Sequence, residues 1–302
     1  MLARLYYLIK SNDAVDQIPG RVLNHLLSDW IFSEKLASSV QSEVLQIKKA
    51  LNKIDISFCF LKGAAYLVSD LHVARGRLFS DIDLMMSFEQ LDDAERALMN
   101  AGWMGGHYDK YDQQYYRRWM HELPPLKHVQ RQTVLDVHHN ILPLTASVKV
   151  DATKLMENSI CIPGTNNYVL APVDMVLHSA AHLFYDGELD HGFRDISDLD
   201  LLFKEFGCQK GFWGELTVRA EELDLSRALY YAVRYTTRIL QSPVPSSTIN
   251  TIQQKSPGFL IEKVMDFLFI RALVPDHPSC DDRWTGLARW LLYIRSHWLR
   301  MP

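Results

Sequence analysis

The sequence predicts an α+β protein, in which a small mixed β-sheet follows N-terminal helices and precedes a C-terminal, mostly helical domain. Three observations support this class. Apolar residues recur at helical spacing over residues 21–53, short β-branched and aromatic runs alternate with helical patterns from about 55 to 145, and the chain after residue 171 carries almost only helical patterns. We therefore expect a helical segment at 1–54, an α/β core at 55–145 and a mostly helical domain at 146–302.

The composition is that of a globular protein without a strong overall charge. The 302 residues are 48% hydrophobic and 23% charged, which is enough apolar material for a sizeable core. A net charge of -4 argues against nucleic acid or an anionic membrane as a partner. We find no apolar run of about 18 residues and no signal peptide, so we expect no transmembrane segment and a cytoplasmic protein.

The cysteines are far apart in the sequence and form no CxxC pair. This spacing indicates neither a zinc ribbon nor a redox motif. We expect four reduced thiols, mostly buried, at the following positions: Cys59, Cys161, Cys208 and Cys280.

The first half of the chain alternates between helical and strand patterns. An apolar stripe along residues 21–53 predicts a helix, and "ISFCFLKG" (56–63) predicts a strand that ends in a tight turn. "AAYLVSDLH" follows as a helix and "DIDLMM" (81–86) as the next strand. "FEQLDDAERALMNAG" predicts a helix closed by Gly102. One more strand is expected in "YYRRWMHEL" or "PLKHV", and "TVLDVHHNI" (133–141) resembles the second half of a hairpin with "LKHV".

The second half is predicted to be helical, starting with "PVDMVLHSAAHLF", whose proline and aspartate suit a first turn. The last segment, "RWTGLARWLLYIRSHWLR", carries an apolar stripe at helical spacing. We expect this stripe to pack on the helical domain; the alternative is an interfacial membrane face, because arginines lie nearby. The stripe consists of Trp284, Leu287, Leu291, Ile294 and Trp298.

Two aspartates interrupt the apolar strand at 81–86. Asp81 and Asp83 stand at positions i and i+2, so their side chains project from one face and repel each other. A divalent cation such as Mg²⁺ would compensate this charge, and it also binds substrate phosphates. Asp136, in "VLDVHHN", is a natural third carboxylate, and His138 shares its face. The alternative for Asp81 and Asp83 is a solvated strand edge without a function.

Several neighbours strengthen the functional interpretation. Lys62 and Gly63 lie at a strand-to-helix turn, where glycine permits close approach of the backbone to a phosphate and lysine can meet its charge. Arg77 and Ser80 precede the aspartates and are further candidates for phosphate contact.

These motifs resemble the nucleotidyltransferase superfamily with a DNA polymerase β-like core. The residues that carry the resemblance are "FLKGAAYLVSD", "RGRLFSDIDLMM" and "VLDVHHNI", and their combination is similar to an uncharacterised bacterial nucleotidyltransferase-like group. The resemblance implies a metal site at Asp81, Asp83 and Asp136, with Mg²⁺ or Mn²⁺ as cofactor. It also implies a nucleoside triphosphate, bound by Lys62, Gly63, Arg77 and Ser80, as the donor to an acceptor that the sequence does not identify.

One position departs from the superfamily pattern. The turn usually carries Gly-Gly or Gly-Ser, whereas this chain has Lys62-Gly63 followed by Ala64. Two hypotheses therefore accompany the transferase: a catalytically weakened member that binds a nucleotide or a partner, and a metal-dependent phosphohydrolase built on the histidine-rich helices.

The histidine-rich region is "HSAAHLFYDGELDHGFRDISDLD". His178 and His182 share a helix face, and Arg194 and Asp198 follow at the same spacing. The related group has a similar pattern, which implies that His182, Arg194 and Asp198 line a cleft. The alternative, an Arg194–Asp198 pair that ties helices together, is equally open, and a zinc site is less well supported because a loop separates the ligands.

Aromatic residues also alternate with Arg117 and Arg118 in "YDKYDQQYYRRWMH". This pattern can stack a nucleotide or a single strand of nucleic acid. We favour a plain hairpin with an exposed aromatic face, because acidic residues dilute the positive charge.

Overall fold

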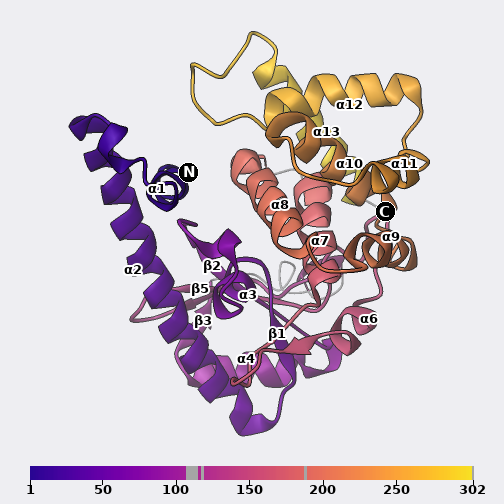
Figure 1. The fold of residues 1–302 in the computed structure, drawn as a ribbon. Helices are drawn as coiled ribbons and strands as arrows, with labels where there is room; N and C mark the ends of the chain where they lie inside the picture. Colours follow the sequence, from indigo (N-terminus) through magenta and orange to yellow (C-terminus); the bar gives the residue numbers. More distant parts are fainter. Residues whose placement is uncertain (107–114, 117–118, 187–188, 301–302) are drawn as a thin grey trace. The chain divides into compact units, whose positions relative to one another are not determined.

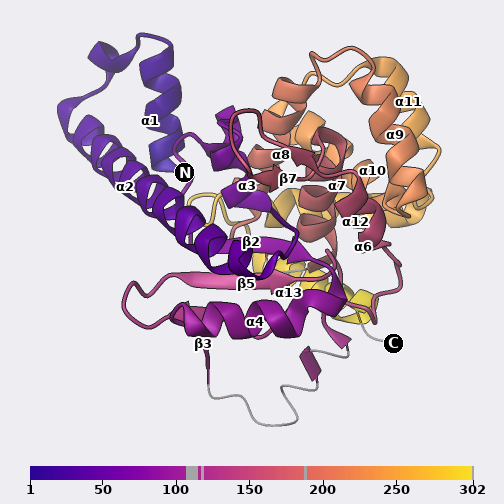
Figure 2. The ribbon, with the colours of Figure 1, turned by 90° about the horizontal axis from the view of Figure 1, so that it is seen from below.

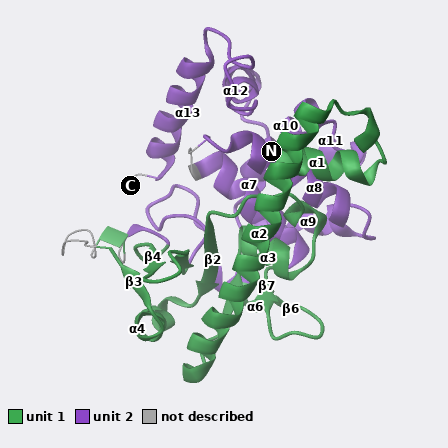
Figure 3. Cartoon of the chain, turned by 90° about the vertical axis from the view of Figure 1, so that its left-hand side faces the viewer, with its two compact units in different colours: residues 1–117, 122–139, 156–170 green, residues 118–121, 140–155, 171–302 purple. Residues whose placement is uncertain are grey.

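The computed structural model describes residues 1–106, 115–116, 119–186 and 189–300. Arg117 and Arg118, with their suggested stacking role, lie outside the described residues. The chain divides into two compact units, coloured separately in Figure 3, and each is considered by itself. The first unit comprises residues 1–117, 122–139 and 156–170, and the second comprises residues 118–121, 140–155 and 171–302.

The first unit begins with two helices, α1 (Leu2–Ser11) and α2 (Gly20–Leu51), which lie against each other. The helix expected over 21–53 is confirmed. Its C-terminal half buries an apolar face against α3 (Lys62–Val68) and α4 (Leu91–Asn100). Figure 1 shows α2 as the long indigo helix beside these shorter ones.

A seven-stranded mixed sheet forms the centre of the first unit, in the order β3-β4-β5-β2-β1-β7-β6. The pairs β2–β5 and β1–β7 are parallel, and the other neighbours are antiparallel. Figure 2 shows β2 and β5 side by side. The strands are β1 (Phe58–Phe60), β2 (Asp81–Met86), β3 (Trp103–Gly105), β4 (Leu126–His128), β5 (Val134–His138), β6 (Ile160–Cys161) and β7 (Tyr168–Val169).

The predicted α+β class and the hairpin of "LKHV" with "TVLDVHH" are confirmed. Strands β1, β2 and β5 supply the core of the sheet, where Phe60, Leu84 and Leu135 are fully buried. The short strands β3, β6 and β7 were not predicted, and β7 extends the sheet by pairing with β1.

The second unit is helical, as the sequence predicts. Two segments of π-helix, His182–Asp186 and Thr236–Leu240, continue α7 and α10. The helices of this half are α6 (Ala152–Glu157), whose last two residues belong to the first unit, α7 (Pro172–Ala181), α8 (Gly192–Phe206), α9 (Phe212–Glu222), α10 (Ser226–Tyr235), α11 (Ser246–Gln253), α12 (Phe259–Ala272) and α13 (Thr285–Arg300).

The expectation for the last helix is wrong in one respect. The predicted helix exists as α13, but its tryptophan stripe does not form the packed face: Trp284 is 40% exposed and Trp298 is 80% exposed. The buried face carries Ala288, Leu292 and Ser296 instead. This face combines one large apolar side chain, Leu292, with two small ones, so a stripe chosen by large apolar residues alone missed it.

The prediction of mostly buried cysteines is also wrong. Cys59, in the central strand β1, is buried, whereas Cys161, Cys208 and Cys280 are exposed. All four are free thiols.

Among the described residues, no helix combines the length and the apolar character that crossing a membrane requires.

Candidate functional site

The parallel pairing of β2 and β5 brings the three predicted carboxylates together. Asp83 lies opposite Asp136 in the register, and Asp81 lies opposite Val134. Paired residues on neighbouring strands project to the same side of a sheet, and so do residues i and i+2 on one strand. Asp81, Asp83 and Asp136 therefore share one face at the start of β2.

Asp136 lies in the most unusual environment of the three. Its Oδ1 atom is buried and has no hydrogen-bond partner among the described residues. The pKa of Asp136 is raised to about 7: burial contributes most, the negative charges of Asp83, Glu122 and Asp81 add to the rise, and His138 opposes it. A buried carboxylate without a partner is costly, so this oxygen is suited to a cation.

Asp83 is 5% exposed and contacts two cationic or protonatable groups. Lys62 Nζ lies 3.6 Å from its Oδ1 atom, and His138 Nε2 lies 3.1 Å from the same oxygen. The sequence placed Lys62 and His138 near the aspartates, and the structure brings both to Asp83.

Glu122 is a fourth carboxylate that the sequence analysis missed. Its Oε2 lies 3.3 Å from His138 Nδ1, and a β-bridge joins the two residues. Burial alone lowers the pKa of His138, but the hydrogen bond to Asp83 and the charge of Glu122 outweigh it and raise the pKa. No motif marks Glu122, because only the non-local bridge to β5 gives it this position.

The Lys62-Gly63 turn packs against strand β2 and the loop that precedes it. Leu61 N donates to Asp83 O at 2.9 Å, and Lys62 starts α3 with a φ of 41° in the left-handed region. At Gly63 a Cβ atom would lie 2.6 Å from Arg77 Nη1, so a larger residue here would displace the guanidinium group.

Arg77 is only 8% exposed and packs against aromatic rings. Its Cζ atom lies 5.9 Å from the ring centre of Tyr66 and 5.7 Å from that of Phe79. The geometry therefore gives Arg77 a packing role under α3, and its expected contact with a phosphate stays a prediction. Ser80 is exposed and donates to Asp81 Oδ1 at 3.0 Å.

Helix α1 supports the loop that leads to Asp81. Arg4 Nη2 donates to Val73 O at 2.7 Å, and a Cβ on Gly76 would lie 2.6 Å from Arg4 N. Gly76 also has a φ of 67°, so glycine is favoured there on two grounds. The helix thus fixes the backbone just before Arg77 and Ser80.

The remaining predicted residues belong to the second unit, so their expected place at a cleft stays a prediction. His182 begins a π-helix, and Asp198 is 3% exposed on α8. The suggested Arg194–Asp198 pair does not form in the described structure, because Arg194 Nε donates to its neighbour Asp195 at 2.8 Å.

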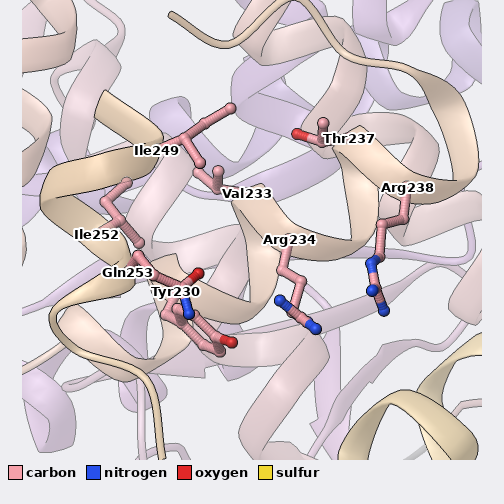
Figure 4. Close-up of a pocket in the computed structure, with 8 residues that line it drawn as sticks. All are labelled: Tyr230, Val233, Arg234, Thr237, Arg238, Ile249, Ile252 and Gln253. Atoms are coloured by element: carbon pink, nitrogen blue, oxygen red, sulfur yellow. The ribbon is translucent and has the colours of Figure 1, made fainter. Parts of the chain in front are cut away.

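The second unit also has a small hollow between α10 with its π-helical continuation and α11. Its volume is about 170 Å³, and Figure 4 shows its lining, with Ile249 and Ile252 on one side and Arg234 and Arg238 toward the other. Both arginines pair with acidic residues, Asp266 for each and Glu262 for Arg234. Their charge is balanced, and we assign no ligand to this hollow.

The carboxylates of the first unit fit a hard divalent cation. Mg²⁺ and Mn²⁺ prefer oxygen ligands, and here Asp81, Asp83 and Asp136 project from one face. The orphaned oxygen of Asp136 is an available donor. The donor set is therefore appropriate for the metal that the sequence resemblance implies.

The fold and this site define an α+β protein with an acidic centre on a mixed sheet. The chain belongs to the family described as uncharacterised nucleotidyltransferase, whose model matches residues 1–241. Among solved structures it is similar to an antigenic nucleotidyltransferase-like protein from Paracoccidioides brasiliensis, at 14% identity and a TM-score of 0.31, with 65% of this chain and 91% of that chain covered. No curated protein matches the chain. Membership of the family confirms the resemblance; the roles of single residues stay predictions.

Proposed function

We propose that the protein transfers a nucleoside monophosphate from a nucleoside triphosphate to a hydroxyl group of a small molecule or a protein, with Mg²⁺ or Mn²⁺ as cofactor. The observation that carries this proposal is the register of β2 and β5, which aligns Asp83 with Asp136 and leaves Asp81 on the same face. The orphaned, buried oxygen of Asp136 adds to it. Membership of the nucleotidyltransferase family supports the same reaction class.

The metal would be held by Asp81, Asp83 and Asp136. Once bound, it would neutralise part of the negative charge of the phosphates. Lys62, whose Nζ lies 3.6 Å from Asp83 Oδ1, can turn to a phosphate and leave the carboxylate to the metal. Gly63 keeps the turn free of a side chain, and Ser80 stands exposed beside Asp81. Arg77 supports the turn through its close contact with Gly63.

In the proposed reaction the acceptor oxygen attacks the α-phosphorus. A new O–P bond forms, the bond from the α-phosphorus to the bridging oxygen breaks, and pyrophosphate leaves with the electron pair. Asp136 or the neighbouring His138 would help to take up the acceptor proton, which then passes to solvent. His138, in contact with Asp83 and Glu122, can orient this carboxylate cluster.

A catalytically weakened member that binds without turnover is the second candidate. The observation that favours it is the contact of the Lys62 ammonium group with Asp83, at a turn where the superfamily usually has small residues. In this case a triphosphate would bind without a requirement for metal and would release no pyrophosphate.

The first experiment is calorimetric titration of each of the four ribonucleoside triphosphates with Mg²⁺. Wild type is compared with Asp81→Asn/Asp83→Asn and with the control Asp92→Asn/Asp93→Asn, which makes the same chemical change on the exposed surface of α4. We expect metal-dependent binding of one triphosphate to wild type and control, and none to the site variant. Absence of binding to wild type with either metal would contradict the transferase.

A further inference from the structure

A large hollow opens in the first unit at the opposite end of the sheet from the carboxylates. Its volume is about 820 Å³, within the range of small-molecule sites. It is formed by the end of α2, the start of β1 and the residues just after β2, together with the hairpin of β6 and β7 and the end of α6. Figure 1 labels α2, α6, β1 and β2, and Figure 3 labels β6 and β7.

The lining is rich in neutral hydrogen-bonding groups. The side chains of Asn52, Gln90 and Asn166 offer amide donors and acceptors, and serines at 57, 87 and 159 offer hydroxyls. Within the described part of the chain, none of these side chains forms a hydrogen bond. Several polar groups that are free to bind and converge on one concave surface are typical of a site for a polar ligand.

The lining also contains apolar surface. Tyr168 is 46% exposed, and it lines the hollow together with Met156 and Phe58. Aromatic and thioether surfaces can receive the C–H face of a sugar ring while amides and hydroxyls bind the ring's substituents.

The charge of the lining disfavours phosphates. The described residues that line the hollow include no lysine, arginine or histidine, and the one acidic residue is Glu157. A carboxylate repels an anionic ligand but accepts hydrogen bonds from two neighbouring hydroxyls. The nucleotide of the proposed reaction would therefore not bind here.

We propose that this hollow binds a neutral saccharide, held by the amides of Asn52, Gln90 and Asn166, by Glu157, and by stacking on Tyr168. Ser87 at its edge follows Asp83 by four residues, a separation of about 13 Å along an extended strand. A sugar in the hollow thus occupies a site separate from the carboxylates. The inference rests on the hollow alone and does not depend on nucleotidyl transfer.

The test is saturation-transfer-difference NMR of the full-length protein with glucose, N-acetylglucosamine and maltose at millimolar concentration. The variants are Tyr168→Ala and Gln90→Ala, and the matched controls are Tyr293→Ala and Gln209→Ala, which make the same changes on the surface of the second unit. Circular dichroism and thermal melting establish that each variant is folded.

We expect transfer to at least one saccharide with wild type and both controls, and an affinity about tenfold lower in the hollow variants, which corresponds to one lost stacking or amide contact. Addition of ATP and Mg²⁺ should not displace the sugar. No transfer to any of the three sugars, or equal transfer in folded hollow variants, would overturn the proposal. Loss of transfer in the controls would overturn it as well, because binding would then lie elsewhere.

Discussion

At the scale of single residues, the protonation of Asp136 connects metal binding to pH. Its pKa is raised to about 7 by burial and by neighbouring carboxylates, so below that pH a proton occupies the carboxyl group and competes with the metal. We expect the affinity for Mg²⁺ to rise about tenfold between pH 6 and pH 8. Calorimetry in buffers of different ionisation enthalpy would measure the affinity and the proton release.

The raised pKa of Asp136 also determines how the stability of the metal-free protein changes with pH. The folded state binds the proton more tightly than the unfolded chain, whose aspartate has a pKa near 3.8. This contribution is therefore present at low pH and is lost as the pH rises through about 7. Asp136→Asn should remove both pH dependences; a metal affinity that keeps its rise with pH in this variant would contradict the assignment.

Gly63 offers a second test at a single residue. A methyl group at this position would meet Arg77 Nη1 at 2.6 Å, and the arginine is held between Tyr66 and Phe79. We expect Gly63→Ala to reduce the free energy of unfolding by about 1–3 kcal/mol, the usual range for overpacking. Urea denaturation would measure this change.

Gly214→Ala is the matched control for Gly63→Ala, because nothing lies within 4 Å of the added Cβ on α9. In an open helical position alanine should leave stability unchanged or raise it by up to about 1 kcal/mol. Equal effects of the two substitutions would show that the Arg77 contact does not constrain the turn.

At the scale of secondary-structure elements, an ion-pair network joins α10 and α12. Arg234 donates to both oxygens of Asp266 at 2.7 Å and to Glu262 at 3.0 Å, and Arg238 also contacts Asp266. Burial by itself raises the pKa of Asp266, but the hydrogen bonds from both arginines outweigh it and lower the pKa.

A lowered pKa makes this network a source of stability that acid removes. The contribution is present above the pKa of an unfolded aspartate and is lost as the pH falls through the folded value. We expect Asp266→Asn to reduce the free energy of unfolding by roughly 1–3 kcal/mol at neutral pH, since the half-buried guanidinium group of Arg234 loses its charged partner and keeps only Glu262. The variant's acid unfolding, followed by circular dichroism, should be shallower than that of wild type.

Helix α13 tests which face of an amphipathic helix is covered. Trp298 is 80% exposed and Leu292 is 1% exposed. Trp298→Gln should therefore change the free energy of unfolding by less than about 0.5 kcal/mol, and Leu292→Ala should lower it by about 2–5 kcal/mol. Thermal melting would measure both changes. A large loss of stability in Trp298→Gln would indicate that the tryptophan stripe is the packed face, as the sequence predicted.

The same elements explain what the sequence could predict. The period-two and helical patterns around Asp83 and Asp136 were sufficient for β2, β5 and the helices between them, because each pattern is local. The mixed sheet and the carboxylate face followed from these elements. The strands β6 and β7 have two residues each, too few for a period, and pair through non-local contacts. Glu122 was not predicted because it too reaches its place through a non-local contact, the bridge to His138. The exposure of Trp298 escaped prediction because periodicity reveals a helix with two faces but not which face is covered.

At the scale of the whole molecule, the chain passes between the two units several times, so neither unit is a continuous stretch of sequence. The sheet itself is completed late, when Val169 on β7 pairs with Phe60 on β1. Cys59 therefore lies in a strand with neighbours on both sides, contributed by distant parts of the chain. Its thiol can become accessible only when this part of the sheet opens.

Thiol reactivity can report that opening. Burial raises the pKa of Cys59 to about 12, and its thiol donates to Met156 Sδ at 3.7 Å, so it is both covered and protonated at neutral pH. We expect 5,5′-dithiobis(2-nitrobenzoate) to label Cys161, Cys208 and Cys280 rapidly in the native protein and Cys59 only in denaturant. A Cys59→Ser variant should show the same rapid phase and lack the slow one. If labelling of Cys59 followed the loss of circular dichroism in urea, the sheet would open in the global transition; rapid labelling of all four thiols in the native protein would contradict the buried position of β1.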